Sequence, residues 1–342
     1  MLTRSTALRN LAITVVAGLV LFGLTEVFSE YRNTQLANAG INFCAIAGLT
    51  VLTGLSGQIS LGNGAFMFIG AYTVALLLKH HPSTSNPELV LIVVAAVVVA
   101  AIVGGFVGTA AARLRGPYLA GVTLALALGV PVLPDYQHLE GPLGGHAGLI
   151  VNAPGPPGGT LDLERWQAWI CCLAALVTFF VLANLRSSRV GRSFTAVRDD
   201  EIAASLAGMS VPRIQILAFV VSAGSAGLAG AMLAIIDGQI GPQSFPLQIS
   251  LFLLAGAVFG GLGSMAGAAY GAVLITFLGG WSTDLSNALS LPSKVDLNLP
   301  PAFYGLVLIV SMLLFPFGLQ GLVRRGWHRV RTRTRPVEVA AR

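Results

Sequence analysis

The chain has 342 residues and a formal net charge of +6; 55% of its residues are hydrophobic and 10% are charged. Soluble domains contain roughly 25% charged residues, so the composition excludes an ordinary soluble domain. Several apolar runs of about 20 residues instead indicate an all-α, polytopic bundle of membrane-spanning helices. The positive charge lies at the ends of these runs, which argues against a nucleic-acid partner, and the three cysteines lack the spacing of a metal site.

Ten membrane spans are predicted along the chain. The first follows Arg4 and Arg9 and has no cleavage site behind it, so we expect it to remain uncleaved. The region Leu247–Gly280 is too long for one crossing of a hydrocarbon core of about 30 Å, so we divide it in two at Gly260–Ser264. The predicted spans cover Leu11–Leu24, Leu36–Leu55, Ala65–Leu78, Glu88–Ala112, Gly116–Leu133, Trp166–Leu185, Ile214–Ile236, the two halves of Leu247–Gly280, and Ala302–Leu322.

The distribution of lysine and arginine predicts the orientation of these spans. With ten spans, 16 of the 20 Lys and Arg residues fall on the side that holds both termini. Cytoplasmic loops carry the excess of these residues, so we expect both termini in the cytoplasm and the polar loop Asp135–Arg165 outside. We expect a single transmembrane domain over residues 1–342, with a cytoplasmic connector at 186–213 and a basic cytoplasmic tail at 323–342 that contacts anionic lipid.

The connector, Arg186–Arg213, is the only long, densely charged stretch between two apolar runs. Three of its apolar residues recur at i, i+4 and i+7, which predicts a short amphipathic helix: Ile202, Leu206 and Met209. Asp199 or Asp200 suits the N-cap of this helix, and Gly208 suits its end. One interpretation is a solvated loop whose arginines only set topology. The other is a docking surface for a soluble partner, because topology alone needs no capped apolar face.

The second predicted span ends in a polar, glycine-rich motif, Ser56–Gly64, that interrupts the apolar pattern. Irregular backbone at membrane depth is tolerated only where it is buried or lines a cavity. Gln58, Ser60 and Asn63 offer neutral hydrogen-bonding groups there and are candidates to line the pathway of a zwitterionic solute. A packing kink made by the glycines of the motif is the alternative, and both interpretations remain open.

Small residues at four-residue spacing predict close contacts between helices. The clearest set surrounds the GGLGS motif at Gly260–Ser264: Gly256, Gly260, Gly263, Gly267 and Gly271. We expect these glycines to pack helices together; seating a partner subunit is the alternative.

The chain lacks the residues that ATP hydrolysis requires. It has only two lysines, Lys79 and Lys294, and neither lies in the phosphate-binding pattern G-x-x-x-x-G-K-[ST]. Its ionisable residues lie in loops or near span ends, which weakens the case for an ion-coupled carrier or an intramembrane enzyme. We therefore expect a non-catalytic chain that binds no metal or other cofactor and whose driving force enters at the connector from a separate ATPase.

Four segments carry a family signal: Gly48–Leu77 with SGQISLGNG, Ala112–Gly129, Gly191–Met232 with RDDEIAA, and Gly241–Leu274 with GGLGS. Taken together and in order, they resemble the membrane permeases of bacterial branched-chain amino acid ABC importers, specifically the subunit with the longer charged connector. The resemblance spans almost the whole chain. Two positions depart from it: Asn63 stands where the family often has histidine, and Val130-Pro131 where it often has glutamate.

The resemblance implies an assembly in the bacterial inner membrane, made of this permease, a second related permease and two cytoplasmic ATPases that bind ATP and Mg²⁺. An extracytoplasmic solute-binding protein would deliver the amino acid. The connector would enter a groove on one ATPase. The expected ATPase contacts are apolar at Phe194, Val197, Ile202 and Leu206, and polar at Arg192, Arg198, Asp199 and Glu201.

Two alternatives stand beside a branched-chain amino acid importer. One is an ABC permease of the same architecture for urea or short amides, and the other is a self-sufficient carrier or channel. A sugar permease is a weaker option, because the RDDEIAA stretch argues against it. The sequence leaves open which solute is carried, how tightly it binds, whether this chain or its partner lines the pathway, and whether the two permeases are identical.

Overall fold

The computed structural model describes residues 4–81, 85–114, 116–156 and 162–288, and a few positions between 302 and 320. The predicted last span, Ala302–Leu322, and the basic tail, 323–342, lie almost entirely outside these residues.

Helices make up most of the described chain. The long helices are α1 (Arg4–Val27), α2 (Glu30–Leu49), α3 (Asn63–His80), α4 (Asn86–Ala111), α5 (Pro117–Gly129), α7 (Leu163–Ser187), α10 (Val211–Asp237), α11 (Leu247–Gly260) and α12 (Met265–Ala288). Shorter helical segments are the π-helix η1 (Thr50–Leu55), which continues α2, the 3₁₀ segments η2 (Val130–Asp135), η3 (Gly145–Ala147) and η4 (Pro242–Ser244), and the helices α6 (Glu140–Leu143), α8 (Arg189–Asp199) and α9 (Glu201–Leu206).

Seven helical stretches in the described residues are long and apolar enough to cross a membrane. They are α1, α2 with η1, α4, α5 with η2, α7, α10, and α11 with η4. This agrees with an all-α, polytopic bundle. Two further predicted spans, α3 and α12, also form helices, but neither is among the seven. The apolar part of α12, Met265–Leu278, is shorter than any of the seven stretches. The count of ten spans therefore stays a prediction.

Two short strands are an exception to the all-α prediction. β1 (Leu149–Ile150) and β2 (Gln239–Ile240) pair antiparallel, with Leu149 opposite Ile240. Between α10 and β2, Gly238 has a φ of 68°, a left-handed conformation that glycine adopts at little steric cost. The strand pair joins the polar loop after α5 to the end of α10.

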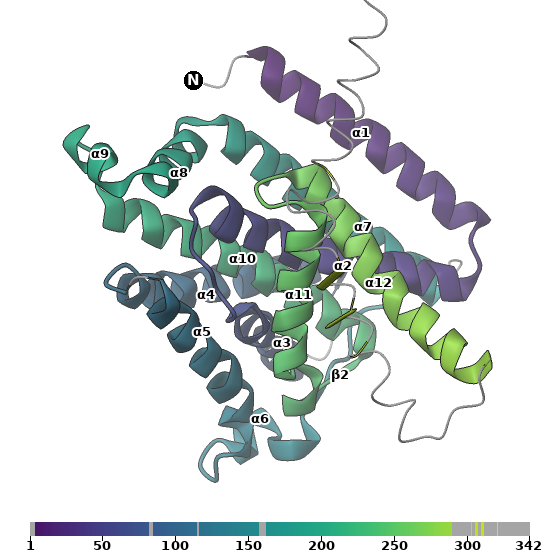
Figure 1. The fold of residues 1–342 in the computed structure, drawn as a ribbon. Helices are drawn as coiled ribbons and strands as arrows, with labels where there is room; N and C mark the ends of the chain where they lie inside the picture. The colour runs from purple at the N-terminus through teal and green to yellow at the C-terminus, as the bar shows by residue number, and fades with distance from the viewer. Residues whose placement is uncertain are drawn as a thin grey trace, which may run out of the picture.

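Helix α10 is the central helix of the bundle and packs against α4, α3 and α2 (Figure 1). Glycines bring its backbone into contact with that of α3. A Cβ atom on Gly70 would lie 2.1 Å from the carbonyl oxygen of Gly227, and one on Gly230 would lie 1.8 Å from that of Met67. A methyl group at either position would force the helices apart, so these glycines fix the position of α3 against α10.

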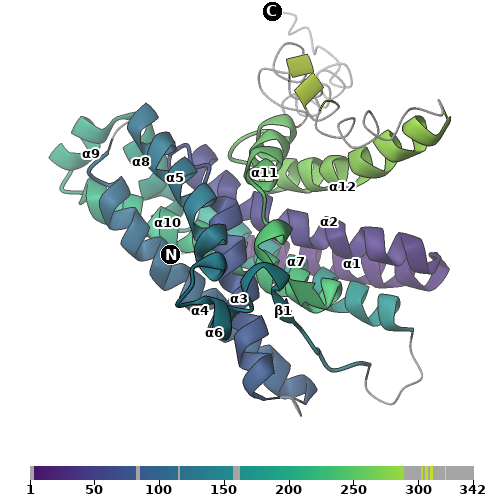
Figure 2. The same ribbon diagram turned by 90° about the horizontal axis from the view of Figure 1, so that it is seen from below.

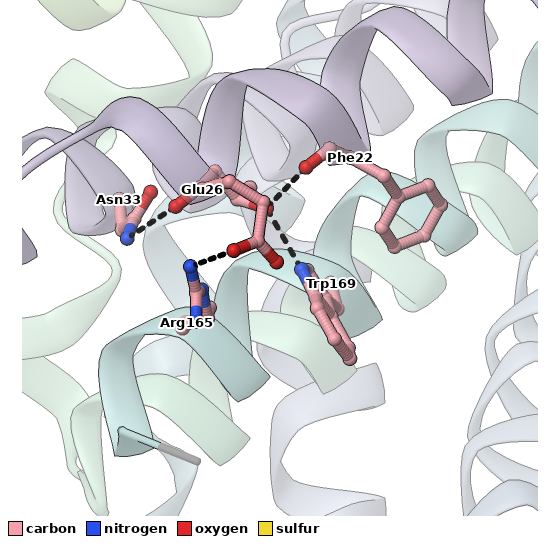
Figure 3. Close-up of polar contacts among 6 residues, drawn as sticks. Phe22, Glu26, Asn33, Arg165 and Trp169 are labelled. Atoms are coloured by element: carbon pink, nitrogen blue, oxygen red, sulfur yellow. Dashed lines mark hydrogen bonds and ion pairs between the residues drawn. The ribbon is translucent and has the colours of Figure 1, made fainter.

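Helices α1, α7 and α2 lie side by side along one side of the bundle (Figure 2). Side-chain contacts fasten α1 to α7 at both ends: Asn10–Asn184 at one end, and Thr25–Trp169 and Glu26–Arg165 at the other (Figure 3). The two helices are therefore antiparallel, and the N-terminal part of α1 lies beside the end of α7 at which the connector begins. Helices α8 and α9 of the connector lie together at one edge of the bundle in Figures 1 and 2.

Candidate functional site

The predicted interruption after the second span is present, and we call residues Ser56–Gly62 the break segment. It follows η1, a π-helix whose wider turn leads out of the α-helical pattern. Ser56 N–H donates to the Val51 carbonyl at 3.1 Å, and Gln58 N–H donates to the Leu52 carbonyl at 3.2 Å. The chain then runs without regular structure to α3. Single-turn π-helices inside α-helices occur frequently at functional sites, so the break segment is the first candidate.

Polar groups on two other helices hold the end of the break segment. Leu61 N–H donates to Thr123 Oγ1 of α5 at 3.0 Å. At the start of α3, Gly64 N–H donates to Ser250 Oγ of α11 at 2.9 Å. A Cβ atom on Gly64 would lie 2.7 Å from the same Ser250 oxygen, so only glycine fits against it without a shift. The end of the break segment is therefore held by α5 and α11, whereas Gly57 and Ile59 nearer its start are exposed.

The three polar residues predicted for the pathway, Gln58, Ser60 and Asn63, are close in the sequence, but the structure gives them different surroundings. All are buried. Asn63 contacts α10 and α2, because Ser222 Oγ donates to its Oδ1 at 3.5 Å and its Nδ2 donates to the Ala45 carbonyl at 3.4 Å. Ser60 Oγ accepts from the N–H of Gly62 at 3.2 Å and so stabilises the local turn. Of the three, Gln58 alone keeps a buried side-chain oxygen that has no hydrogen-bond partner among the described residues.

Three residues that were not predicted share this property with Gln58. Thr50, Thr53 and Ser56 are buried, and their hydroxyl oxygens have no hydrogen-bond partner in the described part of the chain. A buried polar group without a partner is destabilising, so four such oxygens along η1 and the break segment need an explanation beyond packing. Their signal in the sequence is weak, since threonine and serine are common inside apolar helices. Only their nearness to the break distinguishes them.

The connector folds as two capped helices instead of the one that the sequence predicts. Ser188 caps α8, its Oγ accepting from the N–H of Gly191 at 3.3 Å. Asp200 caps α9, as one of the two predicted caps, and its Oδ1 accepts from the N–H groups of Ile202 and Ala203 at 2.8 and 3.0 Å. After α9 the chain turns at Gly208, where φ is 81°. The connector therefore forms two short helices, and most residues of α9 are exposed.

The structure corrects the predicted apolar contacts of the connector. Phe194 and Val197 of α8 are 0% and 1% exposed, so they belong to the interior of this chain and present no surface to a partner. Ile202 and Leu206 of α9 are 73% and 84% exposed. Helical spacing predicts the apolar residues of α9, but it does not reveal which apolar side chains of the connector the rest of the chain covers.

The predicted polar residues of the connector make contacts within the chain. Glu201 Oε1 accepts from Gln215 Nε2 of α10 at 3.0 Å, which fastens α9 to α10. Arg192 Nη1 donates to the Ser187 carbonyl at the end of α7, at 3.3 Å. These contacts fix the position of α8 and α9 relative to the two long helices that they connect.

Arg198 joins the connector to the end of η1. Its Nη1 donates to the Gly54 carbonyl at 2.8 Å, and its Nη2 pairs with Asp199 Oδ1 at 2.7 Å. Next to this bond, Gly57 has a φ of 75°, and a Cβ atom there would lie 2.7 Å from Arg198 Cγ. A Cβ atom on Gly54 would lie 2.1 Å from the backbone nitrogen of Gly263, in the turn between α11 and α12. We call this meeting point of Gly54, Arg198 and Gly263 the junction.

The glycines around the GGLGS motif pack α11 against α12. A Cβ atom on Gly271 would lie 2.1 Å from the Gly256 carbonyl oxygen, and one on Gly260 would lie 1.9 Å from that of Gly267. The helices therefore touch backbone to backbone, within one chain. Gly263 belongs to the turn itself, where its φ is 83°.

Comparison with known proteins identifies a family of membrane proteins. The chain matches the family model described as branched-chain amino acid transport system, permease component, over residues 34–316. It is 34% identical over 258 residues to the high-affinity branched-chain amino acid transport system permease protein LivM of Salmonella typhimurium, and equally to LivM of Escherichia coli K12. Each alignment covers 67% of this chain and 58% of LivM, so the match spans less than two thirds of those relatives.

A second kind of relative is matched over more of its length. The permease protein LivH of Escherichia coli K12, from a high-affinity branched-chain amino acid transport system, is 28% identical over 297 residues, which is 82% of this chain and 92% of LivH. No solved structure matches the chain.

Proposed function

The chain belongs to the family of permease components of branched-chain amino acid transport systems, and we propose that it is the membrane subunit of an ATP-driven importer of branched-chain amino acids. The similarity to LivM and LivH, which are permease proteins of branched-chain amino acid transport systems, supports this substrate class. ATP hydrolysis would take place on partner chains, because neither lysine lies in a phosphate-binding loop. The assembly would contain a second permease, two cytoplasmic ATPases and an extracytoplasmic solute-binding protein.

The observation that carries this proposal is the junction. A subunit that takes its driving force from a partner needs a rigid path from its docking surface to its transport pathway. The Arg198–Gly54 hydrogen bond connects the connector to η1, and the close approach of Gly54 to Gly263 extends the contact to the turn between α11 and α12. Movement of α8 would therefore displace the ends of two broken spans at once, as helix shifts at interfaces do in switching proteins.

The docking surface that we propose for the ATPase is α9. Asp200 fixes the start of this helix, and Glu201 ties it to α10, so its exposed side chains are held in place. Ile202 and Leu206 form an exposed apolar pair beside charged residues, a composition typical of an anchoring contact with a polar rim. The buried side chains of Phe194 and Val197 would hold α8, and with it the adjoining α9, against the rest of the chain.

The pathway that we propose passes η1 and the break segment. Hydroxyl and amide oxygens accept hydrogen bonds, so those of Thr50, Thr53, Ser56 and Gln58 suit the ammonium group of an amino acid. Discontinuous helices line the substrate sites of many transporters. The role of Asn63 would then be to fix α3 against α2 and α10 rather than to bind the solute.

We further propose that the chain lies in the bacterial inner membrane, with ten spans and with both termini and the connector in the cytoplasm. The Asn10–Asn184 contact supports one part of this orientation, because it places the start of α1 beside the end of α7, next to the connector. The excess of arginine near these ends supports the cytoplasmic side.

A permease for urea or short amides is the second candidate, because oxygen acceptors suit the N–H groups of amides as well as an ammonium group. Uptake of labelled leucine and of labelled urea by a deletion strain carrying this chain on a plasmid separates the two. We expect restored leucine uptake. Restored urea uptake without leucine uptake would replace the proposed substrate and leave the architecture of the proposal intact.

A further inference from the structure

Helices α1 and α7 form an antiparallel pair with a hydrogen bond between side chains at each end. Asn10 Nδ2 donates to Asn184 Oδ1 at 2.9 Å, and at the other end Trp169 Nε1 donates to Thr25 Oγ1 at 2.8 Å (Figure 3). The two bonds are 15 residues apart on α1, from 10 to 25, and 15 residues apart on α7, from 169 to 184. The two helices therefore keep a matched register over about 22 Å.

The attachment of α1 to the chain depends on few residues. From position 6 to the end of α1, only Asn10, Gly18 and Thr25 are buried. A Cβ atom on Gly18 would lie 3.2 Å from Leu176 Cδ1, so this glycine contacts α7 in the same register between the two hydrogen bonds. Helices in lipid have no hydrophobic driving force to associate, and polar groups and small residues decide how they pack. The two hydrogen bonds therefore set the register of α1 against α7.

The bond at Asn184 lies beside the corner at which α7 passes into the connector. Asn184 is four residues before Ser188, the N-cap of α8. The backbones touch at this corner, because a Cβ atom on Gly191 would lie 2.4 Å from the Arg186 carbonyl oxygen. Ser188 Oγ also donates to the Leu185 carbonyl at 2.6 Å. Since the corner is closely packed and hydrogen-bonded, the position of the end of α7 determines where α8 starts.

We propose that Asn10 and Asn184 are a positioning pair that fixes the start of the connector, and that α1 thereby serves energy coupling. This rests on the proposed function, in which the driving force enters at the connector. Asn10 is buried, so a change of register would leave its amide without a partner, which is destabilising. A buried asparagine selects one register between helices in this way. Because α8 carries Arg198, a shift at the corner is passed to Gly54 and η1.

A pair that only anchors α1 would contribute to overall stability and to nothing else. Asn10→Leu combined with Asn184→Leu separates the two roles. Replacing both partners by apolar residues leaves no amide unpaired, so the thermal unfolding temperature should stay near that of wild type. The preference for one register is lost, and with it the fixed position of the corner.

The test uses the purified full-length chain and, separately, the complex with its ATPases. The matched control is Thr25→Val with Trp169→Phe, which removes the hydrogen bond at the far end of the same two helices. Amide hydrogen exchange is measured in α8 and, for comparison, in α4, which packs against α10 and α3. In the complex, the measured quantity is the number of leucine molecules taken up per ATP hydrolysed.

We expect α8 of the asparagine variant to exchange about fivefold faster than in wild type, as loss of one hydrogen bond between helices predicts, and α4 to exchange as in wild type. Uptake per ATP should fall in this variant, whereas the control should match wild type in both measurements. Unchanged exchange in α8, or an equal rise in α4, would overturn the proposal. Wild-type uptake per ATP would remove the pair from energy coupling.

The two measurements distinguish failure of this proposal from failure of the proposed function. If the wild-type complex shows no ATP-dependent leucine uptake, the proposed function is wrong, and exchange in α8 still decides whether the pair positions the connector. Should the double variant fail to fold, Asn10→Ser takes its place. The serine side chain is too short to keep the bond to Asn184, and its hydroxyl can bond to a carbonyl of its own helix.

Discussion

The guanidinium of Arg198 donates a hydrogen bond to the backbone carbonyl of Gly54 at 2.8 Å, across 144 positions of the chain. The donor lies on a connector helix and the acceptor lies on the π-helix that ends the second span. One bond therefore unites the two regions that the sequence marks separately as a docking surface and as an interrupted span.

Replacement of Arg198 by lysine should reduce transport more than it reduces stability. A lysine carries the charge, but its single ammonium group cannot reach Asp199 and the Gly54 carbonyl with the planar fork of arginine. Loss of one hydrogen bond from a charged group costs about 1.5–3 kcal/mol, and the retained ammonium charge of lysine offsets part of this loss. We expect ATP-driven leucine uptake to fall about tenfold or more while abundance in the membrane stays near that of wild type.

Arg213→Lys is the control for this change, because Arg213 is an exposed connector arginine outside the junction. Its uptake should match wild type. Normal uptake by the Arg198→Lys variant would show that the bond to Gly54 does not transmit motion.

Replacement of Gly54 by alanine should destabilise the chain. The added methyl group would lie 2.1 Å from the backbone nitrogen of Gly263, so the turn between α11 and α12 must move away. Overpacking of this kind costs about 1–3 kcal/mol. Thermal unfolding in detergent measures the effect, and Gly121→Ala on α5 is the control, because no atom lies within 4 Å of a Cβ atom there. An unfolding temperature for Gly54→Ala at or above that of Gly121→Ala would contradict the close approach.

Aspartate substitutions at two connector positions should separate folding from docking. At Val197, which is 1% exposed, aspartate places a charge in the interior, so the amount of folded protein should drop. At Ile202, which is 73% exposed, aspartate should leave folding intact and abolish co-purification of the ATPase. Membrane abundance and the amount of ATPase recovered with a tagged chain are the two measurements. Full ATPase recovery with Ile202→Asp would remove α9 from the proposed contact.

Removal of single hydroxyl groups should distinguish a solute pathway from a packing kink. Thr53→Val keeps the shape of the side chain and removes an oxygen that has no partner among the described residues, so stability should stay equal or rise. If the oxygen serves the solute, leucine uptake should fall. Thr123→Val is the counterpart: it deprives the Leu61 N–H of its acceptor and should lower stability by about 1–3 kcal/mol. Unchanged uptake with Thr53→Val would favour the packing kink.

Local patterns in the sequence predict those features of the fold that depend on local interactions. The glycines and polar groups of Ser56–Gly64 predict the break, and Asp200 predicts the start of α9, because both depend on neighbours a few residues away. The split of Leu247–Gly280 into α11 and α12 is also confirmed, since its length cannot fit one crossing.

Features that depend on distant parts of the chain were not predictable. Phe194 and Val197 carry the same apolar signal as Ile202 and Leu206, and only the packing of α8 against the bundle distinguishes buried from exposed. The π-helix has no sequence signature, and the contact of Arg198 with Gly54 joins segments that the order of helices alone does not bring together.

Solute uptake into proteoliposomes tests the central claim most directly. One set of vesicles would contain this chain alone, and the other would contain the complex purified from its host membrane through a tag on this chain, with ATP in the compartment that the connector faces. We predict no leucine uptake by the chain alone, and uptake by the complex that requires ATP and disappears with Ile202→Asp. Leucine transport by the chain alone would contradict the account. So would ATP-dependent uptake by a complex whose chain carries both Ile202→Asp and Leu206→Asp.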